Sequence, residues 1–368
     1  MTPTGGFGGP ITVAVNQSHA LRERGHEIHI AGAASGYTQG PPSDVSGIPA
    51  HLFTAHNLVP GSGFAGLVSA GLYRWFRRNH SSFDAIHFHL SRSLTTLPLA
   101  RIAQRSGTRY VTQTHGMIDA TRKLLAVPLD AVYTRPALRG AGSRFFLTPR
   151  ERLDLQDVIG PAALLDYLPN GVPISLVAEN EGKPEAGIEV LYLARLHKRK
   201  RPATFVEVAQ RLSKVFSTAR FSLVGPDEGE GATVDDLIRR GKRSIDDDQI
   251  AWEGALSPDR TLDRMSHASI YVLPSVDEPF PMSVLEAMSL GIPVIVTDSC
   301  GLAGAIQRAG AGIVVDSTTY ALEEAIRRLL SDGEMRRAMG QAARHMVTQD
   351  FSMGAVVGRL EASYRGEL

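Results

Sequence analysis

The sequence DEPFPMSVLEAM at residues 277–288 separates two short apolar runs in the second half of the chain. The run IYVL at 270–273 comes before it, and the run GIPVIV at 291–296 comes after it. Short apolar runs bounded by proline and glycine are typical of buried strands. The order therefore predicts a strand, a loop, a helix and a second strand.

Prolines indicate where the loop ends and the helix begins. Glu278 and Phe280 each precede a proline, which moves both residues away from helical geometry. Pro281 suits the first position of a helix, and Gly291 stands where a helix would stop. Glu286 is therefore expected inside the helix, and Glu278 in the loop before it.

The two glutamates are eight residues apart, one in the loop and the other in the helix that follows it. We therefore expect both side chains to converge on one cleft near the N-terminus of that helix. A helix N-terminus favours anions, so carboxylates beside it need a further explanation. A sugar joined to a phosphate provides one, because carboxylates accept hydrogen bonds from hydroxyls while backbone amides hold the phosphate. Two surface carboxylates beside a proline-rich turn are the alternative.

A second group of charges follows the apolar run at 190–193. This run is expected to form a strand that delivers Arg195, with Lys200 five residues later at the start of a helix. Arginine can bind two oxygens at once and lysine adds a mobile point charge, so the pair suits a diphosphate. The alternatives are a solvated basic turn or a nucleic-acid patch, which are disfavoured because Arg195 directly follows an apolar strand.

These two motifs resemble those of a known family. Glu278 and Glu286, with the seven residues between them and the following sequence AMSLGIPVI, resemble the EX7E element of retaining GT-B glycosyltransferases, family 4 in particular. Arg195 and Lys200 resemble the family's R-x4-K motif. An arginine follows the lysine where the family has a glycine, a departure that changes the loop but not the charges.

The resemblance implies a role for each matched residue. Arg195 and Lys200 would neutralise the leaving diphosphate, so no metal or other cofactor is expected. Glu278 would bind hydroxyls of the donor sugar, and Glu286 those of the ribose. The implied catalytic residues are Glu278, Arg195, Lys200 and His115, and the implied donor-binding residues are Glu286, Phe280, Pro281, Met282, Ser283, Gly225, Gly8 and Gly9.

The N-terminal segment TPTGGFGGP at 2–10 resembles the glycine-rich loop that follows the first strand of a Rossmann-like domain. Only four residues precede its glycines, too few for a strand, so we expect the first strand to be missing from this chain. Glycine lets backbone amides approach a ligand closely, and in the family this loop would lie near the donor phosphate. A merely flexible segment is the alternative.

Histidines lie near two other predicted strands. His115 follows the apolar run at 109–113, and the resemblance implies that it contacts or orients the donor sugar; a structural turn histidine is the alternative. His87 and His89 are expected on one face of a strand. Without an evident third ligand they indicate cleft-edge histidines rather than a metal site. The aspartates at 246–248 precede a strand and are expected in a solvated loop.

Composition indicates the cellular compartment of the protein. The chain has 368 residues, a single cysteine and no apolar run near the ~20 residues of a membrane span. These features predict a cytoplasmic protein. Residues 1–180 hold 16 Lys and Arg against 11 Asp and Glu, whereas residues 181–368 hold 23 against 27. The basic first half predicts an anionic or membrane-associated acceptor, with peripheral contact at the inner membrane face.

The alternation of strands and helices predicts two Rossmann-like domains facing across a cleft, the GT-B fold. The acceptor domain is expected at 1–172, with a C-terminal helix at 351–368 packing back on it, and the donor domain at 173–350. The expected activity is transfer of a sugar from a nucleotide-sugar to a hydroxyl of a glycan, glycolipid or small molecule, with no nucleic acid involved. The alternatives are a donor-binding pseudoenzyme, a sugar-phosphate phosphorylase or a nucleotide-sugar epimerase.

Overall fold

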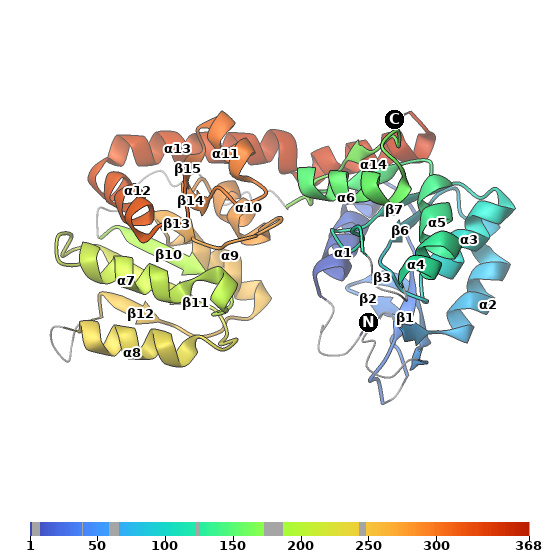
Figure 1. Ribbon diagram of the computed structural model, residues 1–368, viewed down its shortest axis with the longest axis horizontal. Coiled ribbons are helices and arrows are strands. Elements are labelled where there is room, and N and C mark those ends of the chain that lie inside the picture. Colours follow the sequence, from blue (N-terminus) through green and yellow to red (C-terminus); the bar gives the residue numbers. More distant parts are fainter. Residues whose placement is uncertain are drawn as a thin grey trace. The chain divides into compact units, whose positions relative to one another are not determined.

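The computed structural model describes residues 1, 8–38, 40–58, 66–121, 126–172, 187–242 and 248–367. The chain divides into two compact units (Figure 1). Unit 1 comprises Met1–Gly171 and Met353–Leu368, and unit 2 comprises Val172–Ser352. In each unit helices pack on mostly parallel strands, which confirms the predicted α/β class of the fold.

Unit 2 contains a six-stranded parallel sheet in the order β12-β11-β10-β13-β14-β15. After β10 the chain adds β11 and β12 on one side of that strand. It then adds β13, β14 and β15 on the other side. In open parallel sheets, ligands bind beyond the carboxyl ends of the strands where the order reverses. The strands are β10 (Glu189–Leu193), β11 (Arg220–Val224), β12 (Ile250–Trp252), β13 (Ile270–Leu273), β14 (Val294–Thr297) and β15 (Gly312–Val315).

Helices cover both faces of this sheet, and strand side chains alternate between two apolar cores. Leu191 and Tyr271 point into the core under α9, α10, α11 and α13. Val190 and Phe221 point into the core under α7, α8 and α12. The helices are α7 (Pro202–Leu212), α8 (Gly231–Gly241), α9 (Pro258–Ser266), α10 (Met282–Ser289), α11 (Ala303–Ala309), α12 (Thr319–Ser331) and α13 (Gly333–Met346), with a π-helical turn η5 (Val347–Phe351) after α13.

The strands of unit 1 form separate groups. One group has the order β1-β3-β2, a second has the parallel order β6-β7-β8-β9, and β4 pairs with β5 in a small hairpin. The strands are β1 (Ile30–Ala34), β2 (Asp44–Val45), β3 (Ile48–Thr54), β4 (His56–Asn57), β5 (Leu67–Val68), β6 (Ile86–His89), β7 (Tyr110–Gln113), β8 (Arg144–Phe146) and β9 (Asp166–Tyr167).

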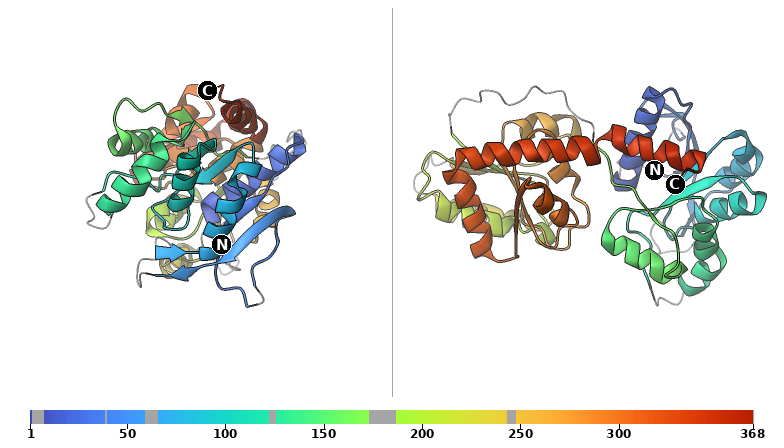
Figure 2. Two further views of the ribbon diagram at one scale, coloured as in Figure 1. Left: turned by 90° about the vertical axis from the view of Figure 1, so that its right-hand side faces the viewer. Right: turned by 90° about the horizontal axis from the view of Figure 1, so that it is seen from above.

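The last helix of the chain, α14 (Met353–Arg365), belongs to unit 1 and packs beside α1 (Gly8–Glu23) (Figure 2). Leu360 and Val357 of α14 are fully buried against Leu21 of α1 and Phe145 of β8. The other helices of unit 1 are α2 (Ala70–Asn79), α3 (Leu97–Ser106), α4 (Ala126–Leu129), α5 (Arg135–Arg139) and α6 (Pro149–Ile159), with a 3-10 turn η2 (His80–Ser82) and a π-helical turn η3 (Asp130–Thr134).

Two local predictions need correction. Gly8 and Gly9 are the first residues of α1 instead of part of a loop, and the rest of the predicted glycine loop, at 2–7, lies outside the described residues. Pro281 is the N-cap of α10, one residue before the helical position predicted for it.

Candidate functional site

The candidate site lies where the strand order of unit 2 reverses. Strands β10 and β13 are parallel neighbours, with Val190 opposite Ile270 and Leu191 opposite Tyr271. The segments that follow the two strands therefore emerge at the same edge of the sheet. The first leads through Arg195 to the turn η4 (Lys198–Lys200), and the second is the loop 274–281 that precedes α10.

The two segments meet through an ion pair between the Lys200 ammonium and the Glu278 carboxylate. Both side chains are largely shielded, with 17% and 14% of their surface exposed. Backbone contacts join the same segments, because the Val276 amide donates to the Arg199 carbonyl at 2.9 Å and the Arg199 guanidinium donates to the Asp277 carbonyl. Two of the residues that the sequence singled out are thus in direct contact.

The loop before α10 has a defined backbone. Asp277 adopts a left-handed φ of 51°, and its amide donates to the Ser299 hydroxyl at 3.2 Å. The Glu278 carbonyl accepts from the Gly301 amide at 2.8 Å. These contacts from the end of β14 hold Glu278 in the loop outside the helix, as its following proline predicts.

Glu286 lies inside α10, as predicted, and its carboxylate has no hydrogen-bond or ion-pair partner in the part of the chain that the structure describes. Burial raises the pKa of this carboxyl above its ordinary value. A shielded carboxylate without a protein donor is unfavourable unless a ligand supplies the hydrogen bonds. Glu286 is therefore available to accept hydrogen bonds from ligand hydroxyls.

Tyr271 holds the start of α10 against the end of β10, a role that was not anticipated from the sequence. Its hydroxyl donates to the Leu193 carbonyl at 2.9 Å and lies 2.7 Å from the Ser283 hydroxyl. Burial raises the pKa of Tyr271, and the nearby charges of Glu286 and Glu278 raise it further. Both carboxylates thus oppose ionisation of the Tyr271 hydroxyl.

Arg195 does not contact Lys200 or Glu278. Its guanidinium donates to the Glu228 carboxylate at 2.8 Å, and its side chain is 61% exposed. A salt bridge between exposed groups is weak, so an anionic ligand can compete with Glu228 for this arginine.

Gly225 lies beside this segment with a φ of 147°, and a Cβ there would be 2.0 Å from the Ala194 carbonyl oxygen. Its amide already donates to the Gly254 carbonyl at 2.8 Å. The observed role of Gly225 is therefore the close packing of two strand ends.

The side chains after Glu278 contribute mainly to packing. Phe280 is partly buried and lies 6.2 Å from the ring of Phe351, measured between centroids. Met282 also packs on the core of unit 2, and Pro281 is buried. Any contact of Phe280, Pro281 and Met282 with a ligand would come from their exposed edges and backbone atoms.

His115 belongs to unit 1 and lies at the end of β7 with a left-handed φ of 53°. Its Nε2 is 2.7 Å from Nδ1 of His89, and the two rings are stacked. His89 in turn stacks on His87, whose Nδ1 is 3.0 Å from the Tyr364 hydroxyl. Burial lowers the pKa of His89 to about 4 and holds those of His87 and His115 well below the ordinary value.

His87 and His89 lie on one face of β6, as the alternation of strand side chains predicts. Their rings stack on each other and do not converge on one point. Across the described residues there is no group of three or more His, Cys, Asp or Glu side chains that could hold a metal ion. The aspartates at 246–247 lie outside the described part of the chain.

Family models match both units of the chain. The model described as "Glycosyl transferase 4-like domain" matches residues 8–171, and "Glycosyl transferases group 1" matches residues 176–346. Among similar curated proteins, a GDP-mannose-dependent alpha-(1-6)-phosphatidylinositol monomannoside mannosyltransferase of Mycobacterium tuberculosis is 26% identical over 73% of this chain and 74% of its own. A D-inositol 3-phosphate glycosyltransferase of Segniliparus rotundus is 25% identical over 99% and 86%.

Solved structures agree with this fold. HepE from Anabaena, in complex with UDP, has a TM-score of 0.73 and 16% identity over 99% of this chain and 98% of its own. A sucrose-phosphate synthase from Thermosynechococcus elongatus has a TM-score of 0.71 and 19% identity, covering 97% and 93%. Two family models that together span most of the chain, and a fold shared over its whole length, define the class. The chain belongs to the GT-B glycosyltransferases of the family 4 type.

No described helix combines the length and apolar character needed to cross a bilayer. Helix α2, which mixes aromatic residues with arginines, buries Leu72 and Phe76 against unit 1. An ordinary amphipathic helix that covers the core is sufficient to explain this pattern.

Proposed function

We propose that this glycosyltransferase moves a sugar from a nucleoside-diphosphate sugar to an acceptor hydroxyl, with retention of configuration and without a metal ion. The observation that supports the proposal is the contact between Lys200 and Glu278 where the sheet of unit 2 reverses its order. Glu286, which has no partner among the described residues, lies in the helix that follows. Basic and acidic groups at one position suit a ligand that has both phosphates and hydroxyls.

Lys200 and Arg195 form the phosphate-binding part of the proposed site. In the structure each is paired with a carboxylate, Lys200 with Glu278 and Arg195 with Glu228. The two negative charges of a diphosphate would draw both cations to the leaving group. Fixed positive charges then stabilise the charge that develops on that group during transfer, which is the role a metal ion has in other enzymes.

Glu278 and Glu286 form the hydroxyl-binding part. We assign the ribose hydroxyls to Glu286, whose shielded carboxylate lacks protein donors among the described residues. Glu278 would bind hydroxyls of the transferred sugar after Lys200 leaves the ion pair and contacts the phosphate. Met282 and Ser283, at the start of α10, would lie next to the nucleotide.

Retention of configuration is proposed through attack on the same face that the phosphate leaves. The leaving phosphate oxygen would accept the proton of the attacking hydroxyl. His115 is proposed to contact the donor sugar with its Nδ1 side, because its Nε2 is already engaged by His89. This histidine is neutral at pH 7, since burial holds its pKa well below the ordinary value.

The acceptor is proposed to be a glycan or a lipid-linked sugar used in polysaccharide or glycolipid synthesis. The M. tuberculosis relative is named for a phosphatidylinositol mannoside acceptor, and residues 60–144 of this chain hold 12 Lys and Arg against 3 Asp and Glu. The enzyme would then be a cytoplasmic protein that binds to the surface of the membrane. We expect binding to vesicles containing anionic lipid that weakens as salt rises; sedimentation indifferent to both lipid charge and salt would contradict this.

The proposed phosphate role of Lys200 is tested by steady-state kinetics. We expect Lys200→Ala to reduce turnover by roughly 100-fold or more, because a preorganised charge at the leaving group is lost. Lys198→Ala is the matched control, since Lys198 is exposed in the same turn and should be dispensable. Circular dichroism checks that both variants fold. Equal turnover in the two variants would overturn the site assignment.

A further inference from the structure

Glu151 is a buried acidic residue in the first turn of α6 in unit 1, with only 2% of its surface exposed. It has no part in the donor site proposed in unit 2. Glutamate is almost never fully buried unless its carboxylate is paired or hydrogen-bonded. The hydrogen bonds that Glu151 makes therefore indicate what its burial serves.

The Glu151 carboxylate accepts hydrogen bonds from three donors that lie outside α6. One oxygen, Oε1, accepts from the Thr114 hydroxyl and from the Gly116 amide, the latter at 2.6 Å. The other oxygen, Oε2, accepts from the Leu147 amide at 2.7 Å. Thr114 and Gly116 are the residues directly before and after His115. A single oxygen atom of Glu151 therefore fixes both neighbours of this histidine.

The segment 114–117 is a tight turn with an unfavourable backbone conformation. The Met117 amide donates to the Thr114 carbonyl at 2.9 Å, and the two residues between them have left-handed φ values, 53° for His115 and 71° for Gly116. Two central residues with positive φ are typical of a type I′ turn, which favours asparagine and glycine. A histidine in this conformation is strained, and such strain persists only where surrounding contacts impose it.

Capping of α6 is the alternative explanation for Glu151, because the residue is the third of the helix. The Thr148 hydroxyl, at the N-cap, accepts from the Glu151 amide at 3.1 Å. A glutamate at this position often bonds back to an amide at the start of the helix, and the bond from Leu147 is of this kind. The bonds from Thr114 and Gly116 come from the turn after β7 and do not cap the helix. Capping therefore explains one of the three bonds.

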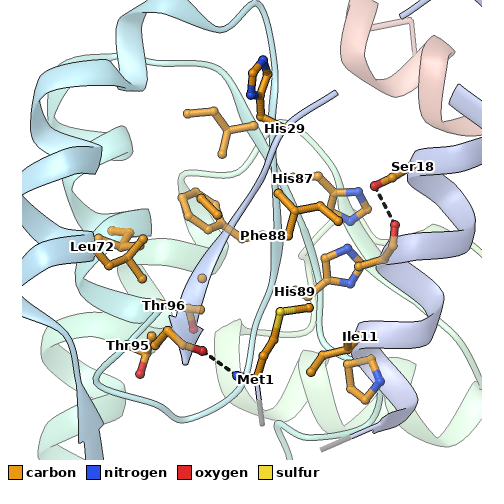
Figure 3. Close-up of a pocket in the computed structure, with 18 of the residues that line it drawn as sticks. Met1, Ile11, Ser18, His29, Leu72, His87, Phe88, His89, Thr95 and Thr96 are labelled. Atoms are coloured by element: carbon orange, nitrogen blue, oxygen red, sulfur yellow. Dashed lines mark hydrogen bonds between the residues drawn. The ribbon is translucent and has the colours of Figure 1, made fainter. Parts of the chain in front are cut away.

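His115 is also held by His89, from the opposite side. Its Nε2 lies 2.7 Å from Nδ1 of His89, which is stacked on His87. Figure 3 shows the rings of His87 and His89 beside each other on one side of β6. Because β7 lies between β6 and β8 in the sheet, His89 approaches the turn from one neighbouring strand, and Glu151, which follows β8, approaches it from the other. The backbone and the ring of His115 are therefore both fixed.

We propose that Glu151 is a positioning residue for sugar transfer, which fixes the turn 114–117 so that the His115 ring is held in one orientation. Glu151 touches no substrate and acts through His115, so the inference rests on the role proposed above for that histidine. In group transfer a displacement of about 1 Å can reduce the rate about 100-fold. Loss of a bond to the turn should therefore lower kcat more than it changes the KM for the donor, which is proposed to bind to unit 2.

The first test compares Glu151→Gln with Asp157→Asn, which changes an exposed carboxylate of the same helix. Glutamine has one oxygen and one NH₂ group, so it cannot accept from both the turn and Leu147. Release of nucleoside diphosphate from a panel of UDP- and GDP-linked sugars measures turnover, at a temperature at which circular dichroism shows both variants to be folded.

We expect kcat to fall roughly 10-fold in Glu151→Gln, while the KM for the donor stays within about twofold of the parent value. Asp157→Asn should match the parent in both quantities. A parent-like kcat in Glu151→Gln would overturn the proposal.

Two substitutions of Thr114 test the bond to the turn without changing α6. Thr114→Val removes the hydroxyl donor with little change of volume, and Thr114→Ser keeps a hydroxyl at the same position. We expect kcat to fall roughly fivefold in Thr114→Val, the loss of one hydrogen bond, and to stay near the parent in Thr114→Ser. Equal kcat values in the two variants would contradict the positioning role.

A double-mutant cycle separates a positioning role from a general structural one. If Glu151 acts through His115, then Glu151→Gln should have little further effect on kcat in a His115→Ala background. Independent losses that multiply would overturn the inference and leave the proposed role of His115 intact. Parent-like turnover of His115→Ala alone would instead contradict the proposed role of the histidine, and the inference with it.

Discussion

Glu286 carries a shielded negative charge that the described part of the protein does not compensate. Burial raises the pKa of its carboxyl, and buried charge without a partner opposes folding. Functional sites often contain such groups, which are held in place for a ligand at some cost in stability. The same residue should therefore affect ligand binding and protein stability in opposite directions.

We predict that Glu286→Gln weakens donor binding by roughly tenfold, the loss expected when a charged hydrogen-bond acceptor becomes neutral. The midpoint of thermal unfolding should stay the same or rise. Glu334→Gln, on the exposed surface of α13, is the control and should change neither quantity. Calorimetric titration with nucleotide and a thermal melt measure the two effects. A destabilised Glu286→Gln protein with unchanged affinity would contradict the assignment.

Sequence spacing predicted that the charged residues of the candidate site follow strands of unit 2, but not how their side chains pair. Lys200 and Glu278 meet because each follows a strand, and the two strands are neighbours in the sheet. The partner of Arg195 could not be predicted, because Glu228 lies after a third strand and the contact depends on side-chain conformation. Tyr271 was also missed, since a tyrosine inside an apolar run gives no signal that its hydroxyl holds the next helix.

Strands β6 and β7 present a stack of three neutral histidines, His87, His89 and His115. Their pKa values lie below the ordinary 6.5 because of burial, and that of His89 falls to about 4. The unfolded chain therefore takes up protons at a higher pH than the folded chain does. The contribution of these neutral histidines to the free energy of unfolding is therefore complete above pH 6.5, and it is lost as the pH falls toward 4.

For His89 alone, this difference corresponds to a loss on the order of 3 kcal/mol between pH 6.5 and pH 4. We predict that the free energy of unfolding of His89→Leu declines less steeply over this interval than that of the parent. Denaturant titrations at a series of pH values measure the slope, whatever the absolute stability of the variant. Parallel pH profiles would contradict the buried neutral state of His89.

Elements with strong apolar patterns were predicted closely, and the short or mixed ones were not. Strand β13 and helix α10 follow directly from the run at 270–273 and from the prolines before Met282. Strand β3 does not follow from the sequence in the same way, because Pro49 and His51 interrupt its apolar pattern. Strand β9 has only two residues, too few for any periodicity. Strands β3 and β9 are both defined by their pairing with neighbouring strands, which the sequence alone does not show.

At the scale of the whole molecule, the two units differ in how much of the chemistry they hold. Unit 2 contains the four charged residues of the proposed donor site, Arg195, Lys200, Glu278 and Glu286. Unit 1 contains the histidine stack and the excess of basic residues. This difference is consistent with our proposal that the donor binds to unit 2 and the acceptor to unit 1.

The most direct test follows the anomeric configuration of the transferred sugar. The protein is incubated with a panel of α-linked nucleoside-diphosphate sugars and hydroxyl acceptors in the presence of EDTA, and the product is examined by proton NMR. We predict an α-linked product that forms at the same rate with and without the chelator. A β-linked product, loss of turnover in EDTA, or a product that forms only when inorganic phosphate replaces the acceptor would contradict the account.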